Sequence, residues 1–243
     1  MELKSVQVPD LNSLPYLDKA DPWSSHSQIK QFLAAYPSGS RVLDVGAATG
    51  MLGRMCTGMQ LILNGIEPNC EWARLCRSYY HSVLCAALDQ APNDFICGHD
   101  VVVCADVLEH MPNPEAALQR LATLQPDHSA FLISVPNVAN LWIRLNLLLG
   151  RFDYAERGIL DRTHLRFFTR RTFFEMLHQC GLSVKKFSVT PVPLPLIHPL
   201  FESNQLGRAA YSILAYSTRL FPTLLGYQFI VEAVKTNNGR KYD

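Results

Sequence analysis

Short apolar runs recur along the chain, separated by stretches in which apolar residues follow a helical period. The runs lie at 41–45, 60–66, 82–86, 100–104 and 130–135, and helices are expected at 25–35, 50–57, 70–79 and 114–124. Strands that alternate with helices are typical of a parallel sheet with crossover helices on its faces. The pattern therefore predicts an α/β fold with a doubly wound, Rossmann-like sheet.

Two further apolar runs, at 182–190 and 227–236, follow expected helices at 171–180 and 205–220, so the predicted sheet has seven strands. Residues 1–24 are rich in Pro, Asp and Ser, and we expect them to form an N-terminal arm. Residues 25–243 then form a single domain with two insertions. One, at 136–170, carries aromatic, Arg and Asp residues, and the other, at 191–224, is helical.

Composition narrows the classes of protein. The chain has 243 residues, 48% of them hydrophobic, which is enough for one sizeable core. Its formal charge is only +1 and no basic block is present, so nucleic acid is not expected as a partner. The 7 cysteines show no Cys-x-x-Cys spacing and are expected to be reduced core residues of a cytoplasmic protein.

No secretory signal is expected at the N-terminus, where the basic flank and apolar run of such a signal are missing. No apolar run approaches the length of about 18 residues that a membrane span needs. We therefore predict no transmembrane span, while peripheral membrane contact stays open, as does the oligomeric state.

The first strand-to-helix turn is where an open parallel sheet binds its ligand. Asp44 ends the first strand, and Gly46 and Gly50 follow it in the turn. A dinucleotide fold would instead have Gly-x-Gly-x-x-Gly here to hold a pyrophosphate. A carboxylate and a glycine turn suit a nucleoside cofactor with a charged amino-acid part, although a glycine turn of this kind also occurs in other α/β proteins.

Further acids follow the next strands. Glu67 comes after the second strand, where a carboxylate can accept from both hydroxyls of a ribose. Asp89, after the third strand, is placed to border an adenine, with a solvated loop acid as the alternative. The fourth strand ends in two acids and a histidine, Asp106, Glu109 and His110.

Together, the segments 42–50 (VLDVGAATG), 66–68 (IEP) and 100–110 (DVVVCADVLEH) resemble class I S-adenosylmethionine-dependent methyltransferases, in the group that contains ubiquinone-biosynthesis O-methyltransferases. The resemblance covers about residues 25–185. The segments 134–137 (SVPN) and 160–169 (LDRTHLRFFT) are similar to bacterial members associated with surface polysaccharide synthesis. The resemblance implies a mostly parallel sheet with an antiparallel last strand.

The resemblance also implies the cofactor, S-adenosylmethionine, and its contacts. Asp44, Gly46 and Gly50 would surround the methionine part, Glu67 the ribose and Asp89 the adenine. The turn also holds Ala48 where the family commonly has glycine, a substitution that narrows the approach of the cofactor without abolishing it. The remaining positions expected to contact the cofactor are Pro68, Asp106 and Val107.

Methyl transfer to a hydroxyl requires a base, and histidine titrates near neutral pH. His110 and His164 are the two candidate catalytic residues, although each can instead have a structural role. Together with Glu109 they offer oxygen and nitrogen ligands, but the sequence spacing is not diagnostic, so no metal site is predicted.

The function expected is O-methylation of a hydroxyl on a small molecule, a quinone precursor or a glycan, with a lipid-linked acceptor as a further alternative. An accessory protein that binds the cofactor without turnover is the main competing class. An NAD-dependent enzyme is the other, because such enzymes also place an acid where Glu67 stands.

Overall fold

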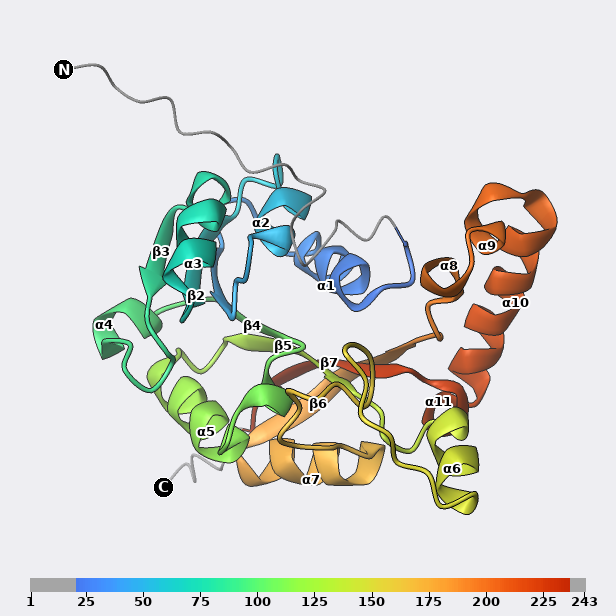
Figure 1. Cartoon of the computed structure of the whole chain (residues 1–243). Coiled ribbons are helices and arrows are strands. Elements are labelled where there is room, and N and C mark those ends of the chain that lie inside the picture. The colour runs from blue at the N-terminus through green and yellow to red at the C-terminus, as the bar shows by residue number, and fades with distance from the viewer. Residues whose placement is uncertain (1–20, 237–243) are drawn as a thin grey trace.

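The computed structural model describes residues 21–236. Its centre is a seven-stranded sheet in the order β3-β2-β1-β4-β5-β7-β6 (Figure 1). The strands are β1 (Arg41–Val45), β2 (Ile62–Glu67), β3 (Ser82–Cys85), β4 (Val101–Ala105), β5 (Ala130–Pro136), β6 (Leu182–Thr190) and β7 (Gln228–Lys235). The predicted fold is confirmed, because β7 alone runs antiparallel to both neighbours, β5 and β6.

Helices cover both faces of the sheet. They are α1 (Ser25–Leu33), α2 (Met51–Met55), α3 (Cys70–Cys76), α4 (Asn93–Ile96), α5 (Pro114–Leu124), α6 (Leu141–Leu148), α7 (Arg170–Gln179), α8 (Leu194–Ile197), α9 (Leu200–Ser203), α10 (Gln205–Leu220) and α11 (Pro222–Leu225), with 3₁₀ turns η2 (Arg77–Tyr79) and η3 (Leu108–His110). Asn113 caps α5 through its side chain and Pro114 begins the helix, where a proline is well tolerated. The expected helix at 205–220 is present with the same bounds.

The core has two halves, one on each face of the sheet. Alternate residues of β4 separate them: Val102 packs with α5 and α7, whereas Val101 and Val103 pack with α1, α2 and α3. This period of two is the ordinary consequence of strand geometry. Both halves are apolar, as expected for a sheet buried on both faces.

The prediction that all cysteines are reduced was wrong at two positions. Cys70 and Cys85 form a disulfide, with their Cα atoms 5.2 Å apart. Cys85 pairs in register with Glu67 across β2 and β3, so the end of β3 lies beside the start of α3. Proximity of this kind comes from strand register, and the sequence spacing gives no sign of it. The other five cysteines are free.

The predicted arm at 1–24 lies mostly outside the described residues, and only its last four residues are described. Among them, Ser24 accepts from the backbone N–H of Ser27 and so caps α1. Within residues 21–236, no helix combines the length and apolar character needed to cross a membrane.

Candidate cofactor and acceptor site

The turn after β1 lies where the strand order reverses, since β1 has β2 on one side and β4 on the other. Gly46 has a φ of +77°, and a Cβ added there would lie 2.6 Å from Val107 Cγ2. Only glycine therefore allows the turns after β1 and β4 to pack this closely. Gly50 has a φ of +86°, and a Cβ added there would lie 2.7 Å from Cys76 Cβ of α3.

Ala48 also adopts a left-handed conformation, with a φ of +47°. An L-residue with a side chain is strained there by about 1 to 2 kcal/mol, whereas glycine is not. The backbone N–H of Ala48 donates to Glu67 Oε2 at 2.8 Å. The turn therefore holds a strained residue whose amide is tied to the acid of β2.

Glu67 is buried at the end of β2 with both carboxylate oxygens in use. Oε2 accepts from Ala48, and Oε1 accepts from the backbone N–H of Asn69 at 2.8 Å. A carboxylate has about four acceptor positions, so each oxygen keeps a further lone pair for a ligand hydroxyl. The two amides fix the carboxylate at this edge of the sheet.

Asp44 lies below the turn, on the side of α3. It is buried, and the hydroxyl of Tyr80 donates to its Oδ2 at 2.5 Å. The pKa of Asp44 is raised to about 7, mainly because the carboxyl group is buried; the hydrogen bond from Tyr80 lowers the pKa, and the nearby charge of Glu67 raises it. A positive group brought beside Asp44 would favour its charged form.

Asp106 follows β4 with a φ of +56°. Its Oδ1 accepts from Ser134 Oγ of β5 at 2.6 Å, and its Oδ2 accepts from Ser25 Oγ of α1 at 3.0 Å. The carboxylate is thus held between two elements at the same edge of the sheet as Glu67. Asp89 and Pro68 lie in the turns after β3 and β2, and both are exposed.

His110 and His164 lie side by side, with ring centroids 4.8 Å apart. His110 ends η3 after β4, and His164 belongs to segment 136–170, the predicted insertion between β5 and α7. The segment is held over η3 because the carbonyl of Glu109 accepts from the backbone N–H groups of Leu165 and Arg166 at 2.8 and 3.0 Å. Residues far apart in sequence therefore form one pair of imidazoles.

The tautomer of His164 follows from its partner. Nδ1 faces the carbonyl oxygen of Ile159 at 3.0 Å, so this nitrogen carries the proton and Nε2 is left as an acceptor. Burial lowers the pKa of His164, which favours the neutral ring. A neutral imidazole with a free acceptor nitrogen is the form that a general base requires.

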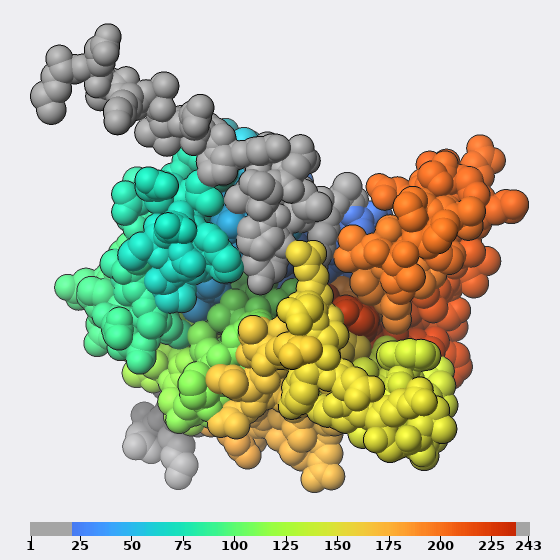
Figure 2. All heavy atoms as spheres, viewed as in Figure 1, coloured from blue at the N-terminus to red at the C-terminus, as the bar shows by residue number. Residues whose placement is uncertain are grey.

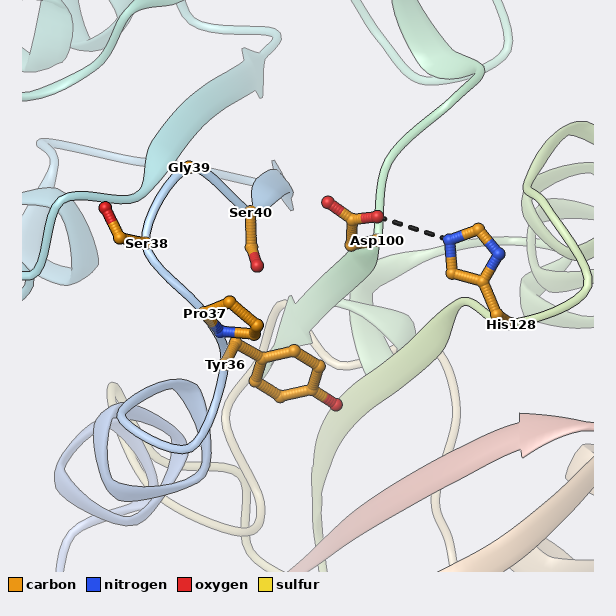
Figure 3. A pocket seen from close by; sticks show the side chains of 7 residues that line it. All are labelled: Tyr36, Pro37, Ser38, Gly39, Ser40, Asp100 and His128. Carbon is orange, nitrogen blue, oxygen red and sulfur yellow. Dashed lines mark hydrogen bonds and ion pairs between the residues drawn. The ribbon is translucent and has the colours of Figure 1, made fainter.

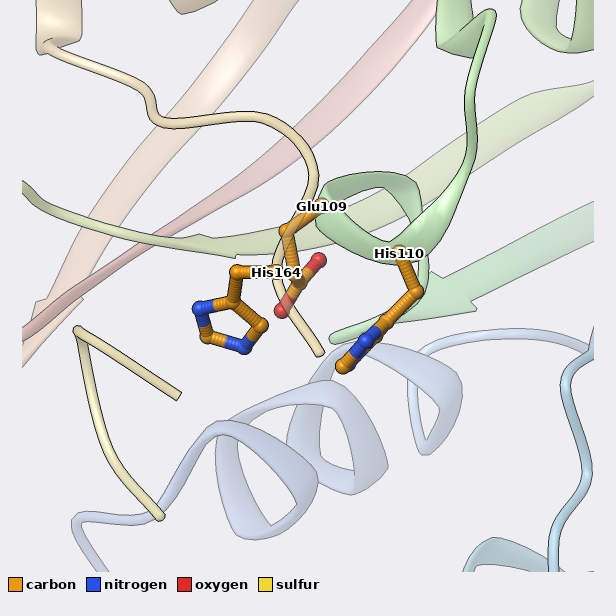
Figure 4. A group of neighbouring side chains, drawn as sticks. All are labelled: Glu109, His110 and His164. Carbon is orange, nitrogen blue, oxygen red and sulfur yellow. The ribbon is translucent and has the colours of Figure 1, made fainter. Parts of the chain in front are cut away.

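Glu109 lies fully buried beside the two histidines. Figure 4 shows its carboxyl group between the two imidazole rings, and Oε2 has no hydrogen-bond partner among the described residues. Burial raises the pKa of Glu109 well above its ordinary value, with Asp106 adding to the effect, so the neutral acid is favoured.

One ligand atom from each of Glu109, His110 and His164 lies within 4.8 Å of the others, so these side chains could hold a divalent ion. The sequence analysis names these three residues as possible ligands, although their spacing is not diagnostic, and the prediction of no metal stays a prediction.

A separate hollow lies at the opposite edge of the sheet. Figure 3 shows it at the amino ends of β1 and β4, where His128 Nε2 lies 3.2 Å from Asp100 Oδ1. Its other lining residues are Tyr36, Pro37, Ser38, Gly39 and Ser40. Ligands of doubly wound folds bind at the carboxyl ends of the strands, so this hollow is not the expected cofactor site.

We call the edge of the sheet with Asp44, Glu67 and Asp106, where the cofactor is predicted to bind, the cofactor side. Three residues that hydrogen-bond to these acids were not found by sequence reasoning: Ser25, Tyr80 and Ser134. Ser25 lies 81 positions from the aspartate it contacts, and Tyr80 lies 36 positions from Asp44. A serine or tyrosine so far along the sequence from its partner forms no recognisable sequence motif with it. Segment 136–170 likewise contains α6, whose residues are apolar on nearly every side and so give no helical period.

The sequence model of the family described as "Methyltransferase domain" matches residues 24–186. The chain belongs to this methyltransferase family. The matched region runs from α1 to within β6 and contains the turns after β1, β2 and β4 together with His110 and His164. It ends before α8, so α8–α11 lie outside the matched region.

Two curated relatives carry the name ubiquinone biosynthesis O-methyltransferase. The one from Glaesserella parasuis is 28% identical over 109 residues, which cover 41% of this chain and 46% of that protein. The one from Cupriavidus pinatubonensis is 26% identical over 182 residues, covering 70% and 71%. The chain thus spans about half to two thirds of the length of the first relatives it matches.

Solved structures share the fold at lower identity. An S-adenosylmethionine-dependent methyltransferase from Archaeoglobus fulgidus is 17% identical with a TM-score of 0.59, covering 86% of this chain and 92% of that one. Magnesium protoporphyrin IX methyltransferase from Synechocystis PCC 6803, solved with bound S-adenosylhomocysteine, is 16% identical with a TM-score of 0.57, covering 87% and 84%.

Proposed function

We propose that this chain transfers the methyl group of S-adenosylmethionine to a hydroxyl oxygen of a small molecule. The observation that carries the proposal is the set of acids at one edge of the sheet, the buried Asp44 and Glu67 and the partly buried Asp106, in a chain of the methyltransferase family. The names of the curated relatives support oxygen as the acceptor atom. A quinone precursor and a glycan are the alternative acceptors.

The residues present fit the cofactor. Glu67 offers two fixed oxygens with spare lone pairs, which suits a pair of adjacent ribose hydroxyls. Asp44 and Asp106 place negative charge near the turn, which suits a cofactor carrying an ammonium and a sulfonium. When bound, S-adenosylmethionine would supply a methyl group on positive sulfur, and S-adenosylhomocysteine would leave as the bond between the methyl carbon and sulfur breaks. Alignment of the acceptor and exclusion of water then supply most of the catalysis.

His164 is the base in this proposal. The hydroxyl proton of the acceptor moves to His164 Nε2 as the oxygen bonds to the methyl carbon, while the carbonyl of Ile159 holds the ring in position. His110, 4.8 Å away between centroids, is the alternative base. The carboxyl of Glu109 lies beside both rings, and its neutral form would avoid stabilising a charged imidazolium before the acceptor arrives.

Calorimetry with S-adenosylmethionine, S-adenosylhomocysteine and NAD tests the cofactor. We expect the first two to bind and NAD to give no heat. Tight binding of NAD with no response to the other two would overturn the proposal.

A screen of hydroxylated acceptors for released S-adenosylhomocysteine tests the reaction. With an acceptor in hand, His164→Gln should bind the cofactor normally and lose turnover by about a hundredfold or more. The exposed His178 of α7 provides the matched control, His178→Gln, which should keep both. Loss of turnover in His110→Gln alone would move the base to His110. Binding without turnover on any acceptor would favour an accessory protein.

A further inference from the structure

The helices α6 and α8–α11 expose large apolar side chains. On α6 and just after it, Trp142, Leu148 and Leu149 are 68%, 82% and 71% exposed. On α10, Leu206, Ile213 and Leu220 are 83%, 67% and 76% exposed. Leu196, Ile197, Tyr216 and Phe221 add to this set. Single exposed apolar residues are normal, but a concentration on neighbouring helices indicates a binding surface.

These helices form one continuous edge of the molecule. In Figures 1 and 2 they lie together on the side of the sheet away from β3, with α11 between α6 and α10. Asn140, which caps α6, donates to the carbonyl of Gly226 just after α11 at 2.9 Å. α10 packs on α9 so closely that a Cβ at Gly207 would lie 2.1 Å from the carbonyl of Leu200. We call this edge the helical edge.

The helix α10 is apolar on two opposite sides. Its inner side consists of Gly207, Tyr211, Ala215 and Thr218, which are buried. Leu206, Ile213 and Leu220 repeat every two turns on the other side and remain exposed. A helix that is already packed through one face needs no second apolar face for folding. The outer stripe therefore requires another explanation.

The charges of the helical edge have one dominant sign. α10 contains Arg208 and Arg219 and no acid, and α6 contains Arg144 and no acid. Glu202 of α9 is the acid within these helices, and Arg151, Asp153 and Glu156 follow α6 in the sequence. On α10, Arg208 and Arg219 lie beside the outer apolar stripe and not within it, and Arg219 lies over the rings of Trp23 and Tyr216. An apolar face flanked by aromatic rings and arginines is the composition of helices that lie in the headgroup region of a membrane.

A second copy of the chain fits this surface less well. In a twofold dimer the same patch faces itself, so arginines of one copy would approach arginines of the other. Anionic lipid headgroups instead neutralise the arginines, while the leucines enter the boundary of the acyl chains. Long Arg side chains can also reach the headgroups while their stems stay with apolar atoms.

We propose that the helical edge binds the surface of an anionic lipid bilayer, with α6 and α10 lying in the interface and no helix crossing it. This attachment does not depend on the proposed methyl transfer. α6 belongs to the same segment as His164, so the bound protein would hold its acceptor side next to the membrane.

Vesicle sedimentation tests the attachment with the full chain. We expect it to bind vesicles of phosphatidylcholine mixed with phosphatidylglycerol, to bind vesicles of phosphatidylcholine alone more weakly, and to be released by salt. The triple variant Leu206→Gln, Ile213→Gln and Leu220→Gln should lower the partition coefficient by about tenfold or more. Gln is a good helix former, so circular dichroism should show an intact fold.

Charge is tested separately. Arg208→Gln should weaken binding by about fivefold, the effect of one basic residue near an anionic surface. Its control is Arg74→Gln on the exposed side of α3, far from the helical edge in Figure 1, which should bind like the wild type. Ile62→Gln, at the start of β2, is the matching control for lost apolar surface.

Three results would overturn the proposal. They are no binding to anionic vesicles by the wild type, equal binding by the triple variant, and a dimer in sedimentation velocity that the triple variant dissociates in the absence of vesicle binding. Because cofactor binding is read by calorimetry, failure here leaves the methyltransferase proposal intact, and the reverse also holds.

Discussion

The cofactor side and segment 136–170 differ in how they are built. At the cofactor side, the turns after β1, β2 and β4 are packed so closely that a single Cβ at Gly46 would overlap Val107, and Asp44 and Glu67 are buried. Segment 136–170 is packed unevenly: a Cβ at Gly158 would lie 2.7 Å from the Tyr227 hydroxyl, whereas one at Gly150 would meet nothing within 4 Å, and Trp142 and Leu148 are exposed. One side is fixed by packing and buried charge, while the other has room to change.

This difference suggests a division of tasks. A cofactor shared by a family needs the same contacts in every member, so the part of the protein that contacts the cofactor allows few substitutions. Acceptors vary, and loops and insertions held on a rigid scaffold commonly carry that variation. Four pairs of substitutions test the division, each with one member on the cofactor side and the matched member in segment 136–170.

The largest expected effect concerns the charge of Asp44. The pKa of Asp44 is raised to about 7 in the folded protein, against about 3.9 in an unfolded chain. The folded protein is therefore most stable below about pH 4, where Asp44 is protonated in both states, and its free energy of unfolding falls as the pH rises from about 4 to about 7. Asp44→Asn should abolish this fall in the free energy of unfolding, which is of the order of 4 kcal/mol, as measured by urea unfolding at acid and at mildly alkaline pH.

The matched substitution is Asp153→Asn, at an exposed acid of segment 136–170. It should follow the wild type at every pH to within about 0.5 kcal/mol. A difference between wild type and Asp44→Asn that does not change with pH would contradict the raised pKa.

Next in size is Gly46→Ala. Left-handed backbone costs a residue with a side chain about 1 to 2 kcal/mol, and the clash with Val107 adds overpacking, so the free energy of unfolding should fall by about 3 kcal/mol. Gly150→Ala has a similar φ, +70°, and open space around the new methyl group. Gly150→Ala should therefore lower the free energy of unfolding only by the cost of the left-handed backbone, about 1 to 2 kcal/mol. Equal losses in the two variants would show that the turns can separate without strain.

Glu67→Ala tests the acid of β2. Removing the carboxylate leaves the amides of Ala48 and Asn69 without their partner and deletes the acceptor that we propose for the ribose, so binding of S-adenosylmethionine should weaken by about 1 to 3 kcal/mol in calorimetry. Glu156→Ala removes an exposed acid that pairs with Arg162 and should leave the titration unchanged. An unaltered curve for Glu67→Ala would refute its role.

The smallest expected effect is a gain. Ala48→Gly relieves the left-handed strain but adds freedom to the unfolded chain, so the net stabilisation should be about 0.5 kcal/mol in urea unfolding. Ala155→Gly in segment 136–170 offers no such relief and should destabilise slightly. If both variants lose stability alike, the φ of Ala48 is not strained in solution.

Most of the sheet could be predicted because each strand is recognisable from the apolar run of its own residues. Buried strands such as β4 are continuous apolar runs, and capping residues such as Asn113 mark where helices begin. α6 was not predicted, because it is apolar on nearly every side and shows no helical period. Residues 191–224 were predicted to be helical, but the bounds of α8, α9 and α11 were not, because four residues are too few to show a period. The disulfide between Cys70 and Cys85 also has no local signal, because it depends on the register between β2 and β3.

The sequence by itself determined the order of strands and helices, and it placed Asp44, Gly46, Glu67 and Asp106 at strand ends, because apolar period and turn chemistry act within a few residues. Only the tertiary structure decided which groups meet: Tyr80 with Asp44, Ser25 with Asp106, and His164 with His110 and Glu109. These contacts join residues that lie tens of positions apart in the sequence. Burial at these contacts raises the pKa of Asp44 and of Glu109. Such long-range contacts follow from packing the whole chain, which no local pattern encodes.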